Sequence, residues 1–180
     1  MNLDRFLAPY KPPQTNLVDM LRYWAGEKPG EVAFYYTNDA EDEVSITYEE
    51  LDRQARAVAA ILQQQSILGQ RVLLLFPPGL DFVVAFFGCL FAGATAVPAY
   101  PPRRNRKADR IGEICANAQA AAVLTCESVL ERREESVQGA PALAQLKWIA
   151  VGQVDVAAAD DWQAPDLDKV ELAILQYTSG

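Results

Sequence analysis

The residues best suited to chemistry in this sequence are Thr178, Ser179 and Gly180, which place two hydroxyls and a glycine directly after an apolar run at 172–175. A loop rich in hydroxyls and glycine after a buried strand is a common way for α/β proteins to present hydroxyl and backbone N–H groups to phosphate. Such a short motif also suits an ordinary turn, and taken alone it favours the turn. The alternative to a turn is a site that binds phosphate.

Other kinds of catalytic centre have little support. The sequence contains no His, and its three cysteines, Cys89, Cys115 and Cys126, are odd in number and lack the CxxC spacing of metal sites. A Ser-His or Cys-His nucleophile pair is therefore excluded within these residues. We expect no metal-ligand set and no catalytic residue in this chain, so its chemistry depends on phosphate binding, on carboxylates, or on residues outside this sequence.

Several elements must position this loop, and they are arranged around residues 71–105, the densest apolar stretch of the chain. Val72–Phe76 is apolar without alternation, which is typical of a strand buried on both faces. Phe82–Ala92 is apolar on nearly every side, which predicts a buried helix ended by Gly93, and Ala94–Ala99 suits a second inner strand. Strand, buried helix and strand form a βαβ unit.

The rest of the chain repeats the alternation of strand and helix. The expected helices are 17–27, capped by Asn16, then 48–65, 107–118 and 127–137; the expected strands are 32–37 and 44–48, joined as a hairpin, then 121–125, 147–151 and 172–175. Thr47 and Glu50 have the spacing of a capping box. The fold class is therefore α/β, a mostly parallel sheet flanked by helices, with a small N-terminal β-hairpin. We expect an irregular arm over 1–15, one α/β unit over 16–180, and a low-order connector at 154–168.

Composition bounds the partners and the compartment. With 16 Lys and Arg against 24 Asp and Glu, the net charge of -8 argues against a nucleic-acid surface. The uncharged run at 82–102 is about as long as the roughly 20 residues that span a bilayer, but its helical part ends near Gly93 and prolines interrupt the remainder. We expect no membrane span, no signal peptide and a cytoplasmic location.

Three stretches carry a resemblance to a known family. LAILQYTSG at 172–180 resembles the opening of the phosphate loop of adenylate-forming enzymes, the superfamily of acyl- and aryl-CoA synthetases, luciferases and peptide-synthetase adenylation domains. In that family the loop continues with Ser-Thr-Gly-x-Pro-Lys-Gly. ITYEELD at 46–52 resembles an early strand-to-helix transition of the family. PPGLDFVVAFFGCLFAGATAVPAYPPRR at 77–104 is similar to one branch, the fatty acyl-AMP ligases, in which PAYPP follows the buried helix.

The resemblance implies the N-terminal portion of an enzyme's large domain. Such an enzyme uses ATP and Mg²⁺ to join a fatty acid to AMP with release of pyrophosphate, and then transfers the acyl group to the phosphopantetheine of an acyl carrier protein. It implies that Thr178, Ser179 and Gly180 bind the ATP phosphates. The remainder of the loop, the Mg²⁺-binding acid and the catalytic lysine fall beyond Gly180, so 16–180 is truncated within the phosphate loop and we expect the 180-residue chain to be inactive alone.

Other interpretations stay open. The acceptor of the acyl group is a carrier protein or, in an acyl-CoA ligase of the same superfamily, CoA; alternatively the chain is a non-catalytic binding or interaction domain. The only concentrated positive charge suits either a solvated loop or a site that steers an acidic carrier protein, and consists of Arg103, Arg104, Arg106, Lys107 and Arg110. Phe82, Phe86, Phe87 and Phe91 suit the core first and an acyl pocket second. The strand expected at 172–176 is apolar on both faces and needs helices and a neighbouring strand to cover it. If part of that cover lies beyond Gly180, we expect the chain to self-associate.

Overall fold

The structure is a computed structural model, and the residues that it describes are 16–38, 40–101, 109–167 and 170–178. The arm predicted over 1–15 and most of the basic cluster lie outside these residues.

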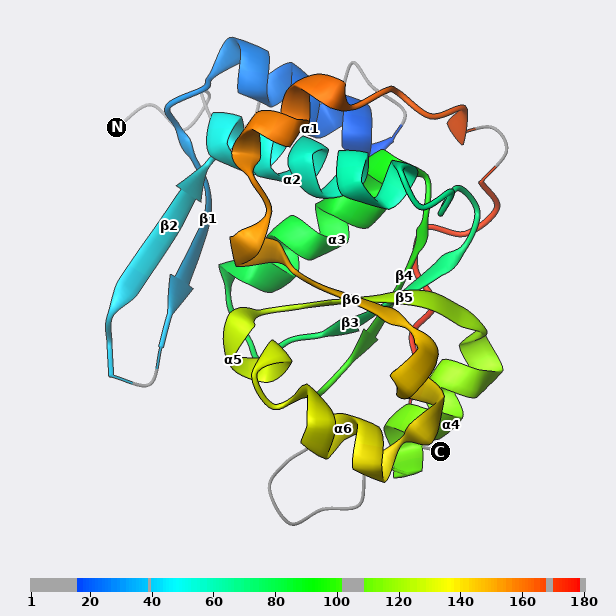
Figure 1. Ribbon diagram of the computed structural model, residues 1–180. Coiled ribbons are helices and arrows are strands. Elements are labelled where there is room, and N and C mark those ends of the chain that lie inside the picture. The colour runs from blue at the N-terminus through cyan, green and yellow to red at the C-terminus, as the bar shows by residue number, and fades with distance from the viewer. Residues whose placement is uncertain (1–15, 39, 102–108, 168–169, 179–180) are drawn as a thin grey trace.

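Helices and strands alternate through most of this part of the chain (Figure 1). The α-helices are α1 Leu17–Glu27, α2 Tyr48–Gln63, α3 Leu80–Ala92, α4 Asp109–Ala118, α5 Glu127–Leu130 and α6 Arg133–Gly139. The strands are β1 Val32–Thr37, β2 Glu43–Thr47, β3 Arg71–Leu75, β4 Thr95–Ala99, β5 Ala120–Thr125 and β6 Lys147–Ala150. Within the described residues the 3₁₀ helices are η2 Pro141–Gln145, η3 Val151–Gln153 and η4 Val156–Asp161.

The central sheet has four parallel strands in the order β4-β3-β5-β6. β3 is an inner strand, and its residues 72–75 are fully buried, as expected for a parallel strand covered on both faces. Figure 1 shows α1, α2 and α3 on one side of the sheet and α4 and α6 on the other. β1 and β2 form a separate antiparallel pair that projects from this body. The predicted α/β class, with its parallel sheet and small N-terminal hairpin, is confirmed.

The helix boundaries follow local signals that the sequence contains. The side chain of Asn16 accepts a hydrogen bond from the Asp19 N–H at 2.9 Å and caps α1. Thr47 and Glu50 form the predicted capping box at the start of α2, each side chain accepting a hydrogen bond from the other residue's backbone N–H. Gly93 ends α3 in the left-handed conformation, with φ 68°, where a residue with a Cβ would be strained.

α2 and α3 pack together unusually closely. A Cβ added at Gly88 of α3 would lie 2.5 Å from Cγ1 and 2.8 Å from Cβ of Val58 on α2, so the close approach requires glycine at this position. α3 in turn lies against β3, β4 and β5. The contact between the two helices therefore helps to fix α3, including the residues at its N-terminal end, relative to the sheet.

Two predictions about the second half of the chain are wrong. The helix expected at 127–137 is two short helices, α5 and α6, separated at 131–132. The connector at 154–168, expected to have little order, contains η4 and is bonded to the core: Arg56 donates to the carbonyl of Ala159 at 2.9 Å, and the Trp162 indole N–H donates to the carbonyl of Phe91 at 2.8 Å. These bonds come from distant helices, so the local composition of the connector does not reveal them.

Candidate phosphate-binding site

Because the strands of the sheet are parallel, their carboxyl ends meet at one edge. The chain runs from β3 to β4 on one side and later returns to β5 on the other side of β3, so the strand order reverses at β3. In open α/β sheets, ligands bind in the crevice outside the carboxyl ends at such a reversal. The loop 76–78 after β3 and Tyr100 after β4 lie at this edge, and both line a hollow of about 910 Å³.

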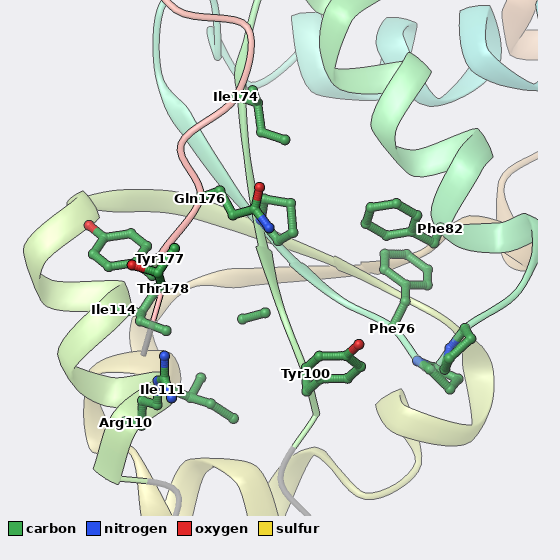
Figure 2. A pocket seen from close by; sticks show the side chains of 14 residues that line it. Phe76, Phe82, Tyr100, Arg110, Ile111, Ile114, Ile174, Gln176, Tyr177 and Thr178 are labelled. Carbon is green, nitrogen blue, oxygen red and sulfur yellow. The ribbon is translucent and has the colours of Figure 1, made fainter. Parts of the chain in front are cut away.

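One wall of this hollow is aromatic. Phe76 and Phe82 lie side by side on it (Figure 2), with ring centroids 6.4 Å apart in an edge-on arrangement. Of the four phenylalanines considered for an acyl pocket, Phe82 lines the hollow, Phe87 and Phe91 are buried in the core, and Phe86 stacks on Phe82 without lining the hollow. The wall offers apolar surface beside the strand ends.

The opposite side is built by the last described segment, 172–178. The Ala96 N–H donates to the carbonyl of Ala173 at 3.0 Å and the Leu175 N–H donates to the carbonyl of Ala96 at 2.8 Å. The Thr95 hydroxyl donates to the carbonyl of Leu172 at 2.9 Å. These bonds hold the segment parallel to β4 and direct its end toward the hollow.

The strand expected at 172–175, with apolar residues on both faces, does not form as a full strand of the sheet. Only one parallel bridge forms, between Ala96 and Ile174, and the side chains of Leu172 and Ile174 are 48% and 43% exposed. The segment adds to the open edge of the sheet beside β4, so sheet and helices flank it less completely than they flank β3. A run of apolar residues indicates a preference for burial, but it does not distinguish an inner position from an edge.

Tyr177 connects this segment to α4. Its hydroxyl donates to Oδ1 of Asn117 at 2.6 Å, and its ring is half-buried against the core. An aromatic residue at the end of a strand more often packs than binds a ligand. The structure shows that Tyr177 packs and also makes a hydrogen bond. Asn117 could not be predicted as its partner, because a single Asn near the end of an expected helix carries no signal of a partner 60 residues away.

Of the three predicted phosphate-binding residues, Thr178 is described and lines the hollow, with its side chain exposed. Ser179 and Gly180 lie outside the described residues, as do Arg103, Arg104, Arg106 and Lys107 of the basic cluster. The remaining member, Arg110, is exposed and lines the same hollow near the start of α4 (Figure 2). The structure thus brings Thr178, which carries a hydroxyl, and Arg110, which carries a guanidinium, to one cavity although they lie far apart in the sequence. This arrangement suits an anion.

The described carboxylates and thiols do not supply a metal site. Within 16–38, 40–101, 109–167 and 170–178, no group of three or more His, Cys, Asp or Glu residues is placed to hold a metal ion.

Near the hollow, partial burial and the neighbouring Glu127 carboxylate raise the pKa of Asp81 at the start of α3. Complete burial raises the pKa of the Cys89 thiol, which favours its neutral form. Also within the described residues, none of the helices has the length and apolar character needed to cross a bilayer.

The chain is similar in sequence to known proteins. Residues 21–180 match the sequence model of a family described as AMP-binding enzyme. The chain is 40% identical over 175 residues to the medium-chain-fatty-acid–(acyl-carrier-protein) ligase JamA of Moorena producens (strain JHB), a match that covers 94% of this chain and 30% of JamA. It is 31% identical over 173 residues to the long-chain-fatty-acid–AMP ligase FadD32 of Mycobacterium marinum (strain ATCC BAA-535 / M), covering 94% of this chain and 28% of FadD32.

A solved structure is similar over the same range. The crystal structure of fatty acyl-adenylate ligase from L. pneumophila in complex with acyl adenylate and pyrophosphate superposes with a TM-score of 0.83 at 36% identity, covering 93% of this chain and 29% of that one. The chain therefore spans less than a third of the length of each of these relatives.

Proposed function

The chain belongs to the family of AMP-binding enzymes, and from this premise we propose that the complete protein adenylates a fatty acid and transfers the acyl group to an acyl carrier protein. In this proposal residues 16–180 are the N-terminal α/β subdomain of the enzyme, and the protein works in the cytoplasm. The observation that carries the proposal is the position of Thr178. It lies at the carboxyl-end hollow, on a segment bonded to β4, and the sequence continues from it into Ser179 and Gly180.

The reaction proceeds in two steps. A carboxylate oxygen of the fatty acid attacks the α-phosphorus of ATP, the bond from that phosphorus to the bridging oxygen breaks, and pyrophosphate leaves. The thiol sulfur of the carrier's phosphopantetheine, after losing its proton, then attacks the acyl carbon, and AMP leaves with the bonding electron pair. Both steps depend mainly on positioning and on stabilisation of charge.

This chain's residues contribute binding and orientation. The hydroxyls of Thr178 and Ser179 and the backbone N–H of Gly180 donate to phosphate oxygens, and Arg110 adds positive charge to the same hollow. Phe76 and Phe82 exclude water from the apolar wall beside the strand ends. Mg²⁺, when bound with ATP, neutralises phosphate charge; the described carboxylates do not form a group that fits it, and we assign it no ligand among them.

The similarity to JamA supports a carrier protein as the acceptor, in preference to CoA. Arg110 also suits a surface that steers the carrier protein, since an acidic partner associates faster with a positively charged surface. The acyl-CoA ligase and the non-catalytic binding domain remain the alternatives that the experiment must separate.

The test uses the complete product of the gene that encodes this chain. With ATP, Mg²⁺ and a series of fatty acids, we expect exchange of labelled pyrophosphate into ATP that depends on the fatty acid, and then acylation of a phosphopantetheinylated carrier protein. Exchange that does not depend on any fatty acid would contradict adenylation and favour a binding domain. Exchange followed by formation of an acyl-CoA thioester, with the carrier left unmodified, would contradict only the choice of acceptor.

A further inference from the structure

We propose that Tyr177 and Asn117 act as a latch, a pair of positioning residues that fixes the start of the phosphate-binding loop without touching the phosphate. The inference rests on the proposed function of Thr178–Gly180, and it assigns a task to two residues that lie outside the loop. The observation behind it is the 2.6 Å hydrogen bond from the Tyr177 hydroxyl to Oδ1 of Asn117.

The latch is the last of a series of attachments along the segment. Leu172, Ala173 and Leu175 are bonded to Thr95 and Ala96 on the β4 side. Beyond Leu175, the only side-chain hydrogen bond that the structure shows within 176–178 is that of Tyr177, and it goes to α4. The segment is thus held by β4 along its length and by α4 at its end, immediately before Thr178.

The acceptor sits on a fixed frame. Asn117 is in the last turn of α4, and β5 begins only three residues later at Ala120, where it pairs with β3. Buried Ile114, Cys115 and Ala118 hold the same turn against the core. The hydrogen bond to Asn117 therefore fixes the position of Tyr177 relative to the centre of the sheet.

The last segment and α4, which both line the hollow, meet at this contact. Figure 2 shows Tyr177 and Thr178 beside α4, with Ile114 and Arg110 along the same helix. Arg110 and Asn117 are seven residues apart, two helical turns, so they lie on one face of α4. The latch thereby sets the distance between Thr178 and the helix that carries the guanidinium.

Without the latch, the last hydrogen bond before Thr178 is the backbone bond of Leu175, so the part of the segment without a hydrogen bond lengthens from one residue to three, held there only by packing of the Tyr177 ring. A looser segment must be ordered again each time ATP binds, and that ordering opposes binding. The cost falls on ATP and not on the fatty acid, because the latch is on the loop side of the hollow, across from Phe76 and Phe82.

A tyrosine that only packs makes a different prediction. Its ring would remain in Tyr177→Phe, so removal of the hydroxyl would change global stability slightly. The Michaelis constants for ATP and for the fatty acid would then stay at their wild-type values. The latch predicts a selective effect on ATP, shared by the two partners.

The experiment uses the complete gene product as wild type, Tyr177→Phe, Asn117→Ala and the double variant, with Tyr35→Phe as a matched control. Tyr35 is an exposed tyrosine of β1, on the projecting hairpin. In pyrophosphate exchange we expect each single variant to raise KM for ATP by about three- to tenfold, the range for loss of one neutral hydrogen bond, with KM for the fatty acid unchanged. We expect the double variant to be no worse than either single variant, and Tyr35→Phe to match wild type.

An unchanged KM for ATP, an equal rise in KM for the fatty acid, or effects that multiply in the double variant would overturn the latch, because uncoupled residues contribute independently. Amide hydrogen exchange of the peptide that contains 172–178, measured without substrates, separates the latch from the proposed function. We expect about three- to tenfold faster exchange there in Tyr177→Phe, even if the wild type shows no adenylation; exchange at the wild-type rate would overturn the latch by itself.

Discussion

Replacing Gly88 with Ala tests the packing that holds α3, and with it Phe82, against the sheet. The added Cβ would lie 2.5 Å from Cγ1 and 2.8 Å from Cβ of Val58, whereas carbon atoms in contact are about 3.5–4.0 Å apart. The Val58 side chain is stiff and its Cβ is attached directly to α2, so a rotamer change cannot relieve both contacts and the helices must separate by about 1 Å.

Overpacking of a core costs about 1–3 kcal/mol, and we expect the upper part of this range because the Cβ contact cannot rotate away. Ala gains about 1 kcal/mol over Gly in a helix, which leaves a net loss of about 1–2 kcal/mol. For a chain of this size the melting temperature should fall by about 2–8 °C. Thermal unfolding followed by circular dichroism measures it.

Gly26→Ala is the matched control. Gly26 is in α1, and a Cβ there would meet nothing within 4 Å, so this variant should gain about 0.5–1 kcal/mol and melt slightly higher than wild type. In a Val58→Ala background the loss from Gly88→Ala should shrink, because the 2.5 Å contact is gone and only the 2.8 Å contact remains. A Gly88→Ala variant as stable as Gly26→Ala, or a loss unchanged by Val58→Ala, would refute the close-packing argument.

Three further predictions concern a cap, the isolated chain and its exposed edge. Thr47→Ala should cost about 1 kcal/mol through loss of the capping box. The backbone N–H and the hydroxyl of Thr47 both lower the pKa of Glu50, and Ala keeps only the first, so the stabilisation from the hydroxyl is present above the usual pKa of Glu and is lost as pH falls through the lowered value. Urea unfolding should therefore show the gap to wild type narrowing in acid, and a gap independent of pH would contradict it. The 180-residue chain alone should form no acyl-AMP, and fatty-acid-dependent pyrophosphate exchange above background would show that the boundary of the catalytic unit is wrong. The same chain should associate as its concentration rises, through the exposed edge at 172–175, and Ile174→Lys should weaken this in sedimentation; wild type that stays monomeric at every concentration is the opposing result.

The parts of the fold that depend on local sequence could be predicted. Asn16, Thr47 and Gly93 mark helix ends because capping uses residues a few positions apart, and the uniform apolar character of β3 and α3 reflects burial on all sides. The errors come from long-range geometry. The alanines and acids of 154–168 gave no sign of the bonds from Arg56 and Trp162, and the apolar pattern of 172–175 does not distinguish an edge from an inner strand.

The site divides in the same way. Residue type and the place after an apolar run mark Thr178 as a candidate in the sequence, and the structure shows that it lines the hollow at the strand ends; its binding of phosphate stays a prediction. The sequence names Arg110 only as part of the basic cluster and gives no role to Asn117, because their relation to Thr178 and Tyr177 exists only once α4 lies beside the last segment. A hydrogen bond across 60 residues leaves no periodic or compositional trace in one sequence.

In our proposal the segment ending at the carboxyl-end hollow holds the phosphates of ATP. The direct measurement is the rate of fatty-acid-dependent pyrophosphate exchange in the complete gene product with Thr178→Ala and, separately, Ser179→Ala. Thr37→Ala, an exposed threonine at the end of β1, is the control. If each hydroxyl donates a charge-assisted hydrogen bond of about 1.5–3 kcal/mol, each loop variant should be slower by about tenfold or more while Thr37→Ala keeps the wild-type rate. Wild-type rates in both loop variants would contradict the claim and remove these residues from the phosphate site.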